Sequence, residues 1–307
     1  MKTGIFLSYK GLGANLMHLS YCHQIAKKFG PVVLLTLNSK LSEILIDDPN
    51  FSEIICLNNY HKKLLDIFKL SKIFKKLGLE NLFIYYPSLR YVLAGKIAGI
   101  KNIHHYPIFK KKNLHLVEAA KTFTEIKLNI KNCPTESKII QNKKIEKLNN
   151  INNKKIILGI GSSGPTTKWG SKNYTSLIKK LSKINKFYFF LLCGPEEEDE
   201  AKKIIENIDS DNCMSLSKKS ISEVKDYISH CDLYIGNDSF GHHISCQMGI
   251  PCFIILLDTP RAYSDYSVNQ NRIIPPNTVL DQITHDSKLD PNSISVEMVL
   301  DKIKNFI

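Results

Sequence analysis

Short apolar runs alternate with longer amphipathic segments through the first hundred residues of the chain. Short apolar runs predict buried strands, whereas apolar residues spaced three to four positions apart predict helices that cover a sheet. Strands that alternate with helices favour parallel sheets built from β-α-β units. The predicted strands are Gly4–Tyr9, Val32–Leu37, Glu53–Leu57 and Asn81–Tyr85. The predicted helices are Leu16–Lys28, Leu41–Asp47, Leu64–Leu77 and Leu89–Ala98.

The segment Lys138–Lys155 interrupts this pattern with the polar run NKKIEKLNNINNKK, which has low complexity. A polar run between two patterned halves is typical of a domain boundary. The chain has 307 residues, a length that fits two domains better than one. The sequence therefore predicts a domain over residues 1–150 and a second over residues 151–307.

The alternating pattern restarts after the boundary. Two such halves predict an α/β protein with two Rossmann-like domains, whose parallel sheets face a central cleft where ligands bind. The terminal helix either stays with the second domain or packs back onto the first. The predicted strands are Lys155–Ile160, Phe187–Leu192, Cys213–Leu216, Leu233–Gly236 and Cys252–Leu257. The predicted helices are Asn173–Ile184, Glu196–Asn207, Ile221–His230, His242–Met248 and Ser293–Phe306.

One segment, Ile235–Pro251, reads IGNDSFGHHISCQMGIP, so that a strand runs into a small polar cluster and a helix. Free N–H groups and a partial positive charge at a helix N-terminus suit a diphosphate. We expect Ser239 to cap the helix and donate to phosphate, and Asp238 to anchor the loop or bind a sugar hydroxyl. The helix dipole disfavours protonation of His242 and His243, so a neutral imidazole would donate to phosphate. An ordinary helix cap remains the alternative.

A second loop, Gly161–Gly170, also follows a predicted strand and precedes a helix. The hydroxyls of Ser162, Ser163 and Thr167 are phosphate donors, and Lys168 adds a point charge. A flexible polar loop is the alternative for any single one of these residues. Trp169, the lone tryptophan, is expected to pack the loop.

These segments resemble glycosyltransferase family 9, the ADP-heptose:lipopolysaccharide heptosyltransferases. In the family pattern, Asp238, Ser239, His243, Gly249 and Pro251 match, while Phe240 replaces a glycine and Gly241 comes one position late. The lysine–tryptophan motif matches at Lys168-Trp169, with the lysine adjacent to the tryptophan instead of two residues before it. The resemblance implies the GT-B fold and a donor diphosphate bound by both loops.

The first strand leads into Gly11, Gly13, Ala14 and Asn15, and the resemblance implies that this turn faces the acceptor. The family carries an acidic general base where this chain has Ala14, and alanine cannot take a proton. We therefore hypothesise that His18 or Glu118 takes the proton from the acceptor. Two alternatives remain open. His18 has a structural or surface role, and Glu118 is an ordinary acid in the first turn of a helix.

The function implied is transfer of a sugar, such as a heptose, from a nucleoside-diphosphate donor to lipopolysaccharide or another surface glycan. The family precedent implies inversion. No DxD-like acidic pair stands where a divalent ion would be needed, so neither a metal nor a cofactor is expected. Two alternatives stay open. One is a nucleotide-sugar epimerase or hydrolase of GT-B fold, and the other is a non-catalytic GT-B binding protein.

The amino-acid composition limits the classes of binding partner that we expect. The net charge is +13, yet only three of the 42 basic residues are arginine, which argues against nucleic-acid binding. Such a surface could still contact anionic lipid or an anionic glycan or lipid-linked acceptor. Eight cysteines without paired spacing indicate reduced thiols. The N-terminal apolar stretch resembles a strand more than a signal peptide, so we expect a cytoplasmic protein that contacts the inner membrane face peripherally.

Overall fold

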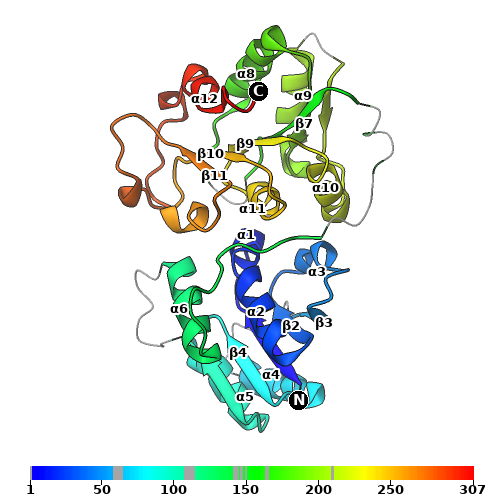
Figure 1. Ribbon diagram of the computed structural model, residues 1–307, viewed down its shortest axis with the longest axis vertical. Helices are drawn as coiled ribbons and strands as arrows, with labels where there is room; N and C mark the ends of the chain where they lie inside the picture. The colour runs from blue at the N-terminus through cyan, green and yellow to red at the C-terminus, as the bar shows by residue number, and fades with distance from the viewer. Residues whose placement is uncertain are drawn as a thin grey trace. The chain divides into compact units, whose positions relative to one another are not determined.

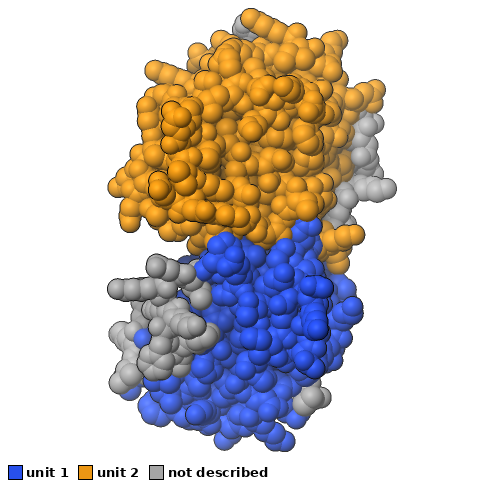
Figure 2. Space-filling view, turned by 60° about the vertical axis from the view of Figure 1, so that its left-hand side comes forward, with its two compact units in different colours: residues 1–137 blue, residues 138–307 orange. Residues whose placement is uncertain are grey.

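The computed structural model describes residues 2–57, 65–106, 115–140, 145, 148, 151–162, 166–208 and 211–307. The chain divides into two compact units, residues 1–137 and 138–307 (Figure 2). The boundary thus falls at the start of the polar segment and not at residue 150. The reason is hydrogen bonding, because the Ile139 N–H donates to the Gln247 carbonyl at 3.1 Å and the Ile145 N–H to the His230 ring at 3.3 Å.

The first unit contains a five-stranded parallel sheet with strand order β3-β2-β1-β4-β5 (Figure 1). The order reverses between β1 and β4, which are neighbours in the sheet. The strands are β1 (Thr3–Leu7), β2 (Val32–Thr36), β3 (Phe51–Cys56), β4 (Asn81–Ile84) and β5 (Asn102–His105). The helices are α1 (Leu12–Leu16), α2 (Leu19–Phe29), α3 (Lys40–Ile44), α4 (Asp66–Leu77), α5 (Leu89–Ile97) and α6 (Leu116–Leu128).

The predicted helix Leu16–Lys28 corresponds to α2, which begins three residues later at Leu19, and the separate short helix α1 precedes it. The chain leaves α1 at Met17, whose N–H donates to the Gly13 carbonyl at 2.9 Å. His18 then stands at the N-cap of α2 instead of inside a continuous helix. The strand β5 was not predicted.

The second unit contains a six-stranded parallel sheet with strand order β11-β10-β9-β6-β7-β8. This is a Rossmann-type order, with the reversal between β6 and β9. The strands are β6 (Lys154–Gly159), β7 (Phe187–Leu192), β8 (Cys213–Ser215), β9 (Leu233–Asn237), β10 (Cys252–Ile255) and β11 (Gln270–Ile273). The α-helices are α8 (Ser171–Ile184), α9 (Glu198–Glu206), α10 (Ile221–Ile228), α11 (Phe240–Gln247) and α12 (Val296–Ile303). Short 3₁₀ helices are η1 (Pro195–Glu197), η2 (Arg261–Ser264), η3 (Leu280–Gln282) and η4 (Pro291–Ser293).

The central strands β6 and β9 approach each other closely where they end. Gly159 pairs with Gly236 in the register, and a Cβ on Gly236 would lie 2.5 Å from the Gly159 backbone. Only glycine fits there, because real Cβ atoms do not come so close to a backbone. The Tyr174 hydroxyl donates to the Gly159 carbonyl at 2.8 Å, which fixes α8 against the end of β6.

The terminal helix α12 belongs to the second unit. Its buried residues Val296, Val299 and Ile303 lie in that unit's apolar core, and the helix contacts α8, β10 and β11 (Figure 1). All eight cysteines are free thiols, as their spacing predicted. Among the described residues, no helix is both long enough and apolar enough to span a bilayer.

Candidate functional site

The two loops singled out from the sequence leave the carboxyl ends of β6 and β9, the neighbours at which the strand order of the second unit reverses. The crevice beyond such a switch point is where open α/β sheets bind ligands. Asn237, at the end of β9, joins the two loops. Its side-chain amide donates to the Ile160 carbonyl at 2.8 Å, and its oxygen accepts from the Trp169 N–H at 3.0 Å.

Trp169 fixes the far end of the first loop. Its ring is buried, packs edge-on against Tyr174 at 5.0 Å, and donates its N–H to the Ile294 carbonyl at 2.8 Å. The expectation that this tryptophan packs the loop is confirmed. Because Trp169 is fixed in this way, the backbone position of the preceding residue, Lys168, is fixed as well.

Lys168 points to the acids that follow β7. Its ammonium lies 3.0 Å from Glu197 and 3.8 Å from Glu200. Glu197 also accepts the backbone N–H groups of Ser162 at 3.3 Å and Gly194 at 2.7 Å. Burial opposes ionisation of Glu197, but the Lys168 hydrogen bond and charge, with the backbone donors, lower its pKa. Lys168 has three N–H donors, so pairing with Glu197 leaves it able to donate to a ligand.

The remaining residues of the first loop are held by one another and by β10. The Ser162 and Thr166 hydroxyls are hydrogen-bonded to each other. The Thr167 N–H donates to Asp258, which follows β10, at 2.7 Å. Burial raises the pKa of Asp258 against the opposing Thr167 hydrogen bond, and the charge of Asp238 adds to the rise. Ser163 lies outside the described residues.

The N-terminus of α11 faces the same edge of the sheet. Ser239 is its N-cap, and the Ser239 hydroxyl accepts the Gly241 N–H at 3.3 Å, as predicted. The helix begins at Phe240, two residues earlier than expected. A Cβ on Gly241 would lie 2.1 Å from the Leu192 side chain, so this glycine lets α11 pack against β7.

Asp238 and the two histidines form one cluster. Oδ1 of Asp238 lies 3.0 Å from Nδ1 of His242 and 3.8 Å from Nε2 of His243. The other ring nitrogens face protein groups: Nε2 of His242 lies 3.3 Å from the Tyr263 carbonyl, and Nδ1 of His243 lies 2.6 Å from the Tyr266 hydroxyl. Both histidine rings are buried, and their centroids are 3.8 Å apart.

The pKa values of the two histidines shift in opposite directions. Burial opposes protonation of His242, yet the charge and hydrogen bond of Asp238 outweigh it and raise the pKa of His242. Burial and the neighbouring His242 charge lower the pKa of His243 well below its ordinary value. The direction for His243 is the one expected for a neutral imidazole, whereas Asp238 at 3.0 Å shifts the pKa of His242 against the helix dipole.

The same three side chains are the cluster within the described part of the chain that offers metal-ligand atoms, all within 4.8 Å of one another. A metal ion would need the lone pair on Nδ1 of His242. That nitrogen lies 3.0 Å from the Asp238 carboxylate and accepts the Ser239 N–H at 3.4 Å, a contact that uses the same lone pair. A metal ion would have to displace this hydrogen bond of the helix cap.

The first unit places His18 in an aromatic core. The side chain is 1% exposed, stacks on Tyr9, and donates from Nδ1 to the Ala14 carbonyl at 2.6 Å. Its Nε2 lies 3.3 Å from the Tyr106 hydroxyl, and burial lowers the pKa of His18 to about 4. A base must reach its substrate, so this burial argues against the catalytic role hypothesised for His18.

Asn15 holds the turn after β1. Its amide donates to the carbonyls of Tyr9 at 3.0 Å and Gly11 at 2.7 Å, and its oxygen accepts from Thr36 at 3.0 Å. The side chain is buried, so within this unit it supports the loop. Gly11 is exposed, Gly13 is half-buried and Ala14 is buried.

Glu118 lies in the first turn of α6 and is exposed. The neighbouring Val117 carbonyl accepts the Tyr21 hydroxyl at 3.1 Å, and Tyr21 is in the first turn of α2. Both first turns lie at the carboxyl edge of the parallel sheet, which is where the turn after β1 also lies. Glu118 therefore has the exposure that His18 lacks.

The sequence motifs did not reveal three residues of the site: Asn237, Glu197 and Asp258. A signal existed, because each stands at or just after the carboxyl end of a strand, and parallel strands bring these ends to one edge. Local motifs alone did not pair Glu197 with Lys168, since the two belong to neighbouring β-α connections.

The chain is similar to proteins of known family and known structure. The family model of glycosyltransferase family 9 (heptosyltransferase) matches residues 99–271, more than half of the chain. No curated protein sequence gives a significant match. A glycosyltransferase family 9 structure from Veillonella parvula has a TM-score of 0.79 at 14% identity, covering 99% of this chain and 97% of its own.

Two E. coli structures are also similar. ADP-heptose LPS heptosyltransferase II has a TM-score of 0.73 at 13% identity, with coverage of 100% and 98%. Heptosyltransferase WaaC with ADP has a TM-score of 0.71 at 14% identity, with coverage of 100% of both chains. At these identities the likeness shows the fold, and the two parallel-sheet units are those of the GT-B class.

Proposed function

The chain belongs to glycosyltransferase family 9, and on that premise we propose that it transfers a sugar from a nucleoside diphosphate to a lipopolysaccharide or other surface-glycan acceptor. A heptose carried on ADP is the first candidate donor, since a similar structure is described with ADP. The observation that supports donor binding best is the pair of loops at the β6–β9 switch point, joined by Asn237.

We infer that the donor diphosphate lies against the N-terminus of α11. The helix offers backbone N–H groups and a partial positive charge there, and the Ser239 hydroxyl is at the cap. Lys168, with 26% of its side chain exposed, approaches from the other loop. His242 lies buried behind Asp238, whose carboxylate raises the pKa of that histidine. These groups meet phosphate charge without a metal ion or cofactor.

Asp238 is suited to hold the loop and the transferred sugar. It is 13% exposed at its side chain and lies 3.0 Å from Nδ1 of His242, so one face of the carboxylate is fixed. A fixed carboxylate accepts hydrogen bonds from sugar hydroxyls without reordering. His243 contributes through this cluster and through Tyr266.

Inversion by direct displacement needs a base on the acceptor hydroxyl, and Ala14 cannot supply it. Of the two hypothesised bases, Glu118 is the exposed one and His18 the buried one. We propose that Glu118 takes the proton as the acceptor oxygen bonds to the anomeric carbon and the nucleoside diphosphate leaves.

The test combines donor binding with transfer. A thermal-shift screen over nucleoside diphosphates and their sugars is expected to show the largest stabilisation with ADP compounds. With the sugar donor and a glycan acceptor, Glu118→Gln is expected to lower kcat by a factor of roughly 100 or more. Glu43→Gln, another exposed first-turn acid of the first unit, is the matched control. EDTA is expected to leave the rate unchanged.

Other results would contradict individual parts of the proposed function. A preference for UDP or GDP compounds would contradict the ADP donor. An epimerised or hydrolysed sugar formed without acceptor would favour the epimerase or hydrolase reading. Donor binding without turnover on any acceptor would favour a non-catalytic protein.

Peripheral membrane contact is a further part of the proposal. Helix α4 exposes Phe68 by 58%, with Leu65 just before the helix exposed by 70%, and carries Lys69 and Lys72 nearby. An apolar and basic helix face suits anionic lipid. Pelleting with phosphatidylglycerol vesicles is expected to fall for Phe68→Ser but not for Phe306→Ser, and equal pelleting would contradict the contact.

A further inference from the structure

The chain passes between the two units once, at residues 137 and 138. In the second unit, the linker is held at Ile139, whose side chain is buried and whose N–H donates to the Gln247 carbonyl at 3.1 Å. In the first unit, it is held at Ser137, whose hydroxyl lies 2.6 Å from Nδ1 of His23. Lys138, which is exposed, is the one residue between these two anchors. The connection is therefore short and fixed at both ends.

The anchor in the first unit is a line of three side chains, Ser137, His23 and Asp48, which we call the clasp. His23 lies in α2, and its Nε2 is 2.7 Å from Oδ2 of Asp48, which stands just before β3. The Asp48 side chain is 3% exposed and the His23 side chain 17% exposed. The other carboxylate oxygen accepts the backbone N–H of Asn50 at 3.0 Å and its side-chain amide at 2.8 Å. Asp48 is thus held from two sides and fixes the ring of His23.

The clasp does not depend on one charge state of the histidine. Burial opposes ionisation of Asp48, but the hydrogen bond and charge of His23, with the Asn50 donors, lower the pKa of Asp48. The ionised carboxylate accepts the Nε2–H of the ring. Nδ1 then faces the Ser137 hydroxyl, which can either donate or accept a hydrogen bond. The contact between Ser137 and His23 is therefore kept whether the imidazole is neutral or protonated.

Two further hydrogen bonds fix the linker before it reaches the clasp. The Glu125 carboxylate of α6 accepts the Cys133 N–H at 2.9 Å, and Cys133 is buried. The Ser20 hydroxyl of α2 donates to the Pro134 carbonyl at 2.6 Å. Because α2 and α6 pack against each other, the linker lies on a firm support up to Ser137.

We propose that Ser137 and His23 are positioning residues for the transfer, because the clasp confines rotation between the two units to the backbone at Lys138. The inference rests on the proposed function, in which a base of the first unit acts on a sugar bound by the second. Hinges are formed by a few residues that absorb large changes in φ and ψ. A hinge of one residue permits few directions of rotation, so the reacting groups return to the same geometry in each cycle. Release of Ser137 lengthens the hinge and lowers the fraction of cycles with the correct geometry.

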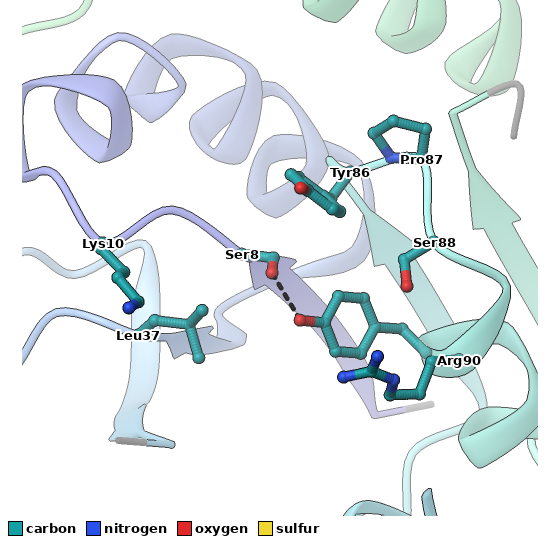
Figure 3. Close-up of a pocket in the computed structure, with 8 residues that line it drawn as sticks. Ser8, Lys10, Leu37, Tyr86, Pro87, Ser88 and Arg90 are labelled. Atoms are coloured by element: carbon teal, nitrogen blue, oxygen red, sulfur yellow. Dashed lines mark hydrogen bonds between the residues drawn. The ribbon is translucent and has the colours of Figure 1, made fainter. Parts of the chain in front are cut away.

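The clasp is separate from the groups that face ligands. A pocket at the carboxyl edge of the first sheet is lined by Ser8, Lys10 and Arg90, among others (Figure 3), and none of the three clasp side chains lines it. The donor loops belong to the second unit. A substitution in the clasp can therefore change the hinge without removing a group from either place.

The first test is limited proteolysis of the full chain without ligand. Trypsin cleaves after lysine, and Lys138 is exposed, so its anchored neighbours limit the cut in the wild type. Ser137→Ala removes the hydroxyl and leaves the His23–Asp48 pair intact. We expect cleavage after Lys138, identified by mass spectrometry, to become roughly tenfold faster, since one lost hydrogen bond changes the local opening equilibrium by about that factor. Cleavage after Lys186, an exposed lysine of the second unit, is expected to be unchanged.

The second test separates positioning from binding. With the sugar donor and a glycan acceptor, Ser137→Ala is expected to lower kcat by roughly tenfold. The Kd of ADP is expected to stay unchanged, because the donor loops are not altered. Ser137→Thr keeps a hydroxyl and should restore both the slow cleavage and the kcat. Ser42→Ala is the matched control, since that hydroxyl donates locally to the Ser39 carbonyl, and it should behave like the wild type.

Two results would overturn the proposal. Equal cleavage after Lys138 in the wild type and Ser137→Ala would show that the clasp does not hold the linker. Faster cleavage with an unchanged kcat would show that the clasp does not position the reacting groups. Absence of transfer by the wild type would instead count against the proposed function, and the cleavage comparison needs no transfer. The two failures are therefore distinguishable.

Discussion

At the scale of single residues, the pKa shifts of the Asp238 cluster depend on a contact within the motif and on tyrosines from a later segment. The helix dipole disfavours protonated histidines and contributes about 0.3–1 kcal/mol. A charge pair at a separation of about 4 Å contributes roughly 4 kcal/mol at an effective dielectric of about 20. Asp238 at 3.0 Å therefore shifts the pKa of His242 more than the dipole does. Tyr263 and Tyr266, which orient the two rings, come from a later segment.

A pH dependence of stability follows from this ion pair. The folded pKa of His242 lies above its unfolded value of 6.5, so the stabilisation is complete below that pH and is lost as the pH rises through the folded pKa. Between about pH 6 and pH 9, the wild type should lose more unfolding free energy than Asp238→Asn. Urea denaturation at both pH values measures this. Asp286→Asn, an exposed aspartate, should behave like the wild type; an identical pH slope in Asp238→Asn would refute the ion pair.

At the scale of elements, apolar runs predicted the strands that contain them, and strands without such a run were missed. The strands β1, β2, β4, β6, β7, β9 and β10 are buried and were predicted, as were the edge strands β3 and β8. The edge strands β5 and β11 read NIHH and QNRI and lack an apolar run. Nor does any glycine or proline mark the break between α1 and α2 at Met17. That break places His18 at the N-cap of α2 and removes it from the helix face assumed for it.

The position of α11 depends on close packing at Gly241. A Cβ there would lie 2.1 Å from the Leu192 side chain, so Gly241→Ala must displace that buried side chain or shift the helix away from β7. We expect a loss of about 1–3 kcal/mol in unfolding free energy, and weaker ADP binding because the cap of α11 moves. Gly11→Ala is the control, since a Cβ on Gly11 meets nothing within 4 Å and the residue's φ is −68°. Denaturation and calorimetry would contradict this view if both variants matched the wild type.

At the scale of the whole molecule, the two units have separate apolar cores. One core cluster is formed entirely by residues before position 101, and the other entirely by residues after position 155. The repeated alternation of strands and helices predicted this division. The exact boundary was not predicted, because it depends on where the polar segment hydrogen-bonds. Both donor loops lie in the second unit.

Separate cores predict separate responses to ligand. ADP at about 100 times its Kd should stabilise the unit that binds it by roughly 2.7 kcal/mol. Hydrogen exchange should then slow most in β6, β9 and α11, with smaller changes in β1 and α5. Protection by ADP confined to the first unit would contradict the donor site. The donor half of the reaction can thus be assigned to its unit before any transfer is measured.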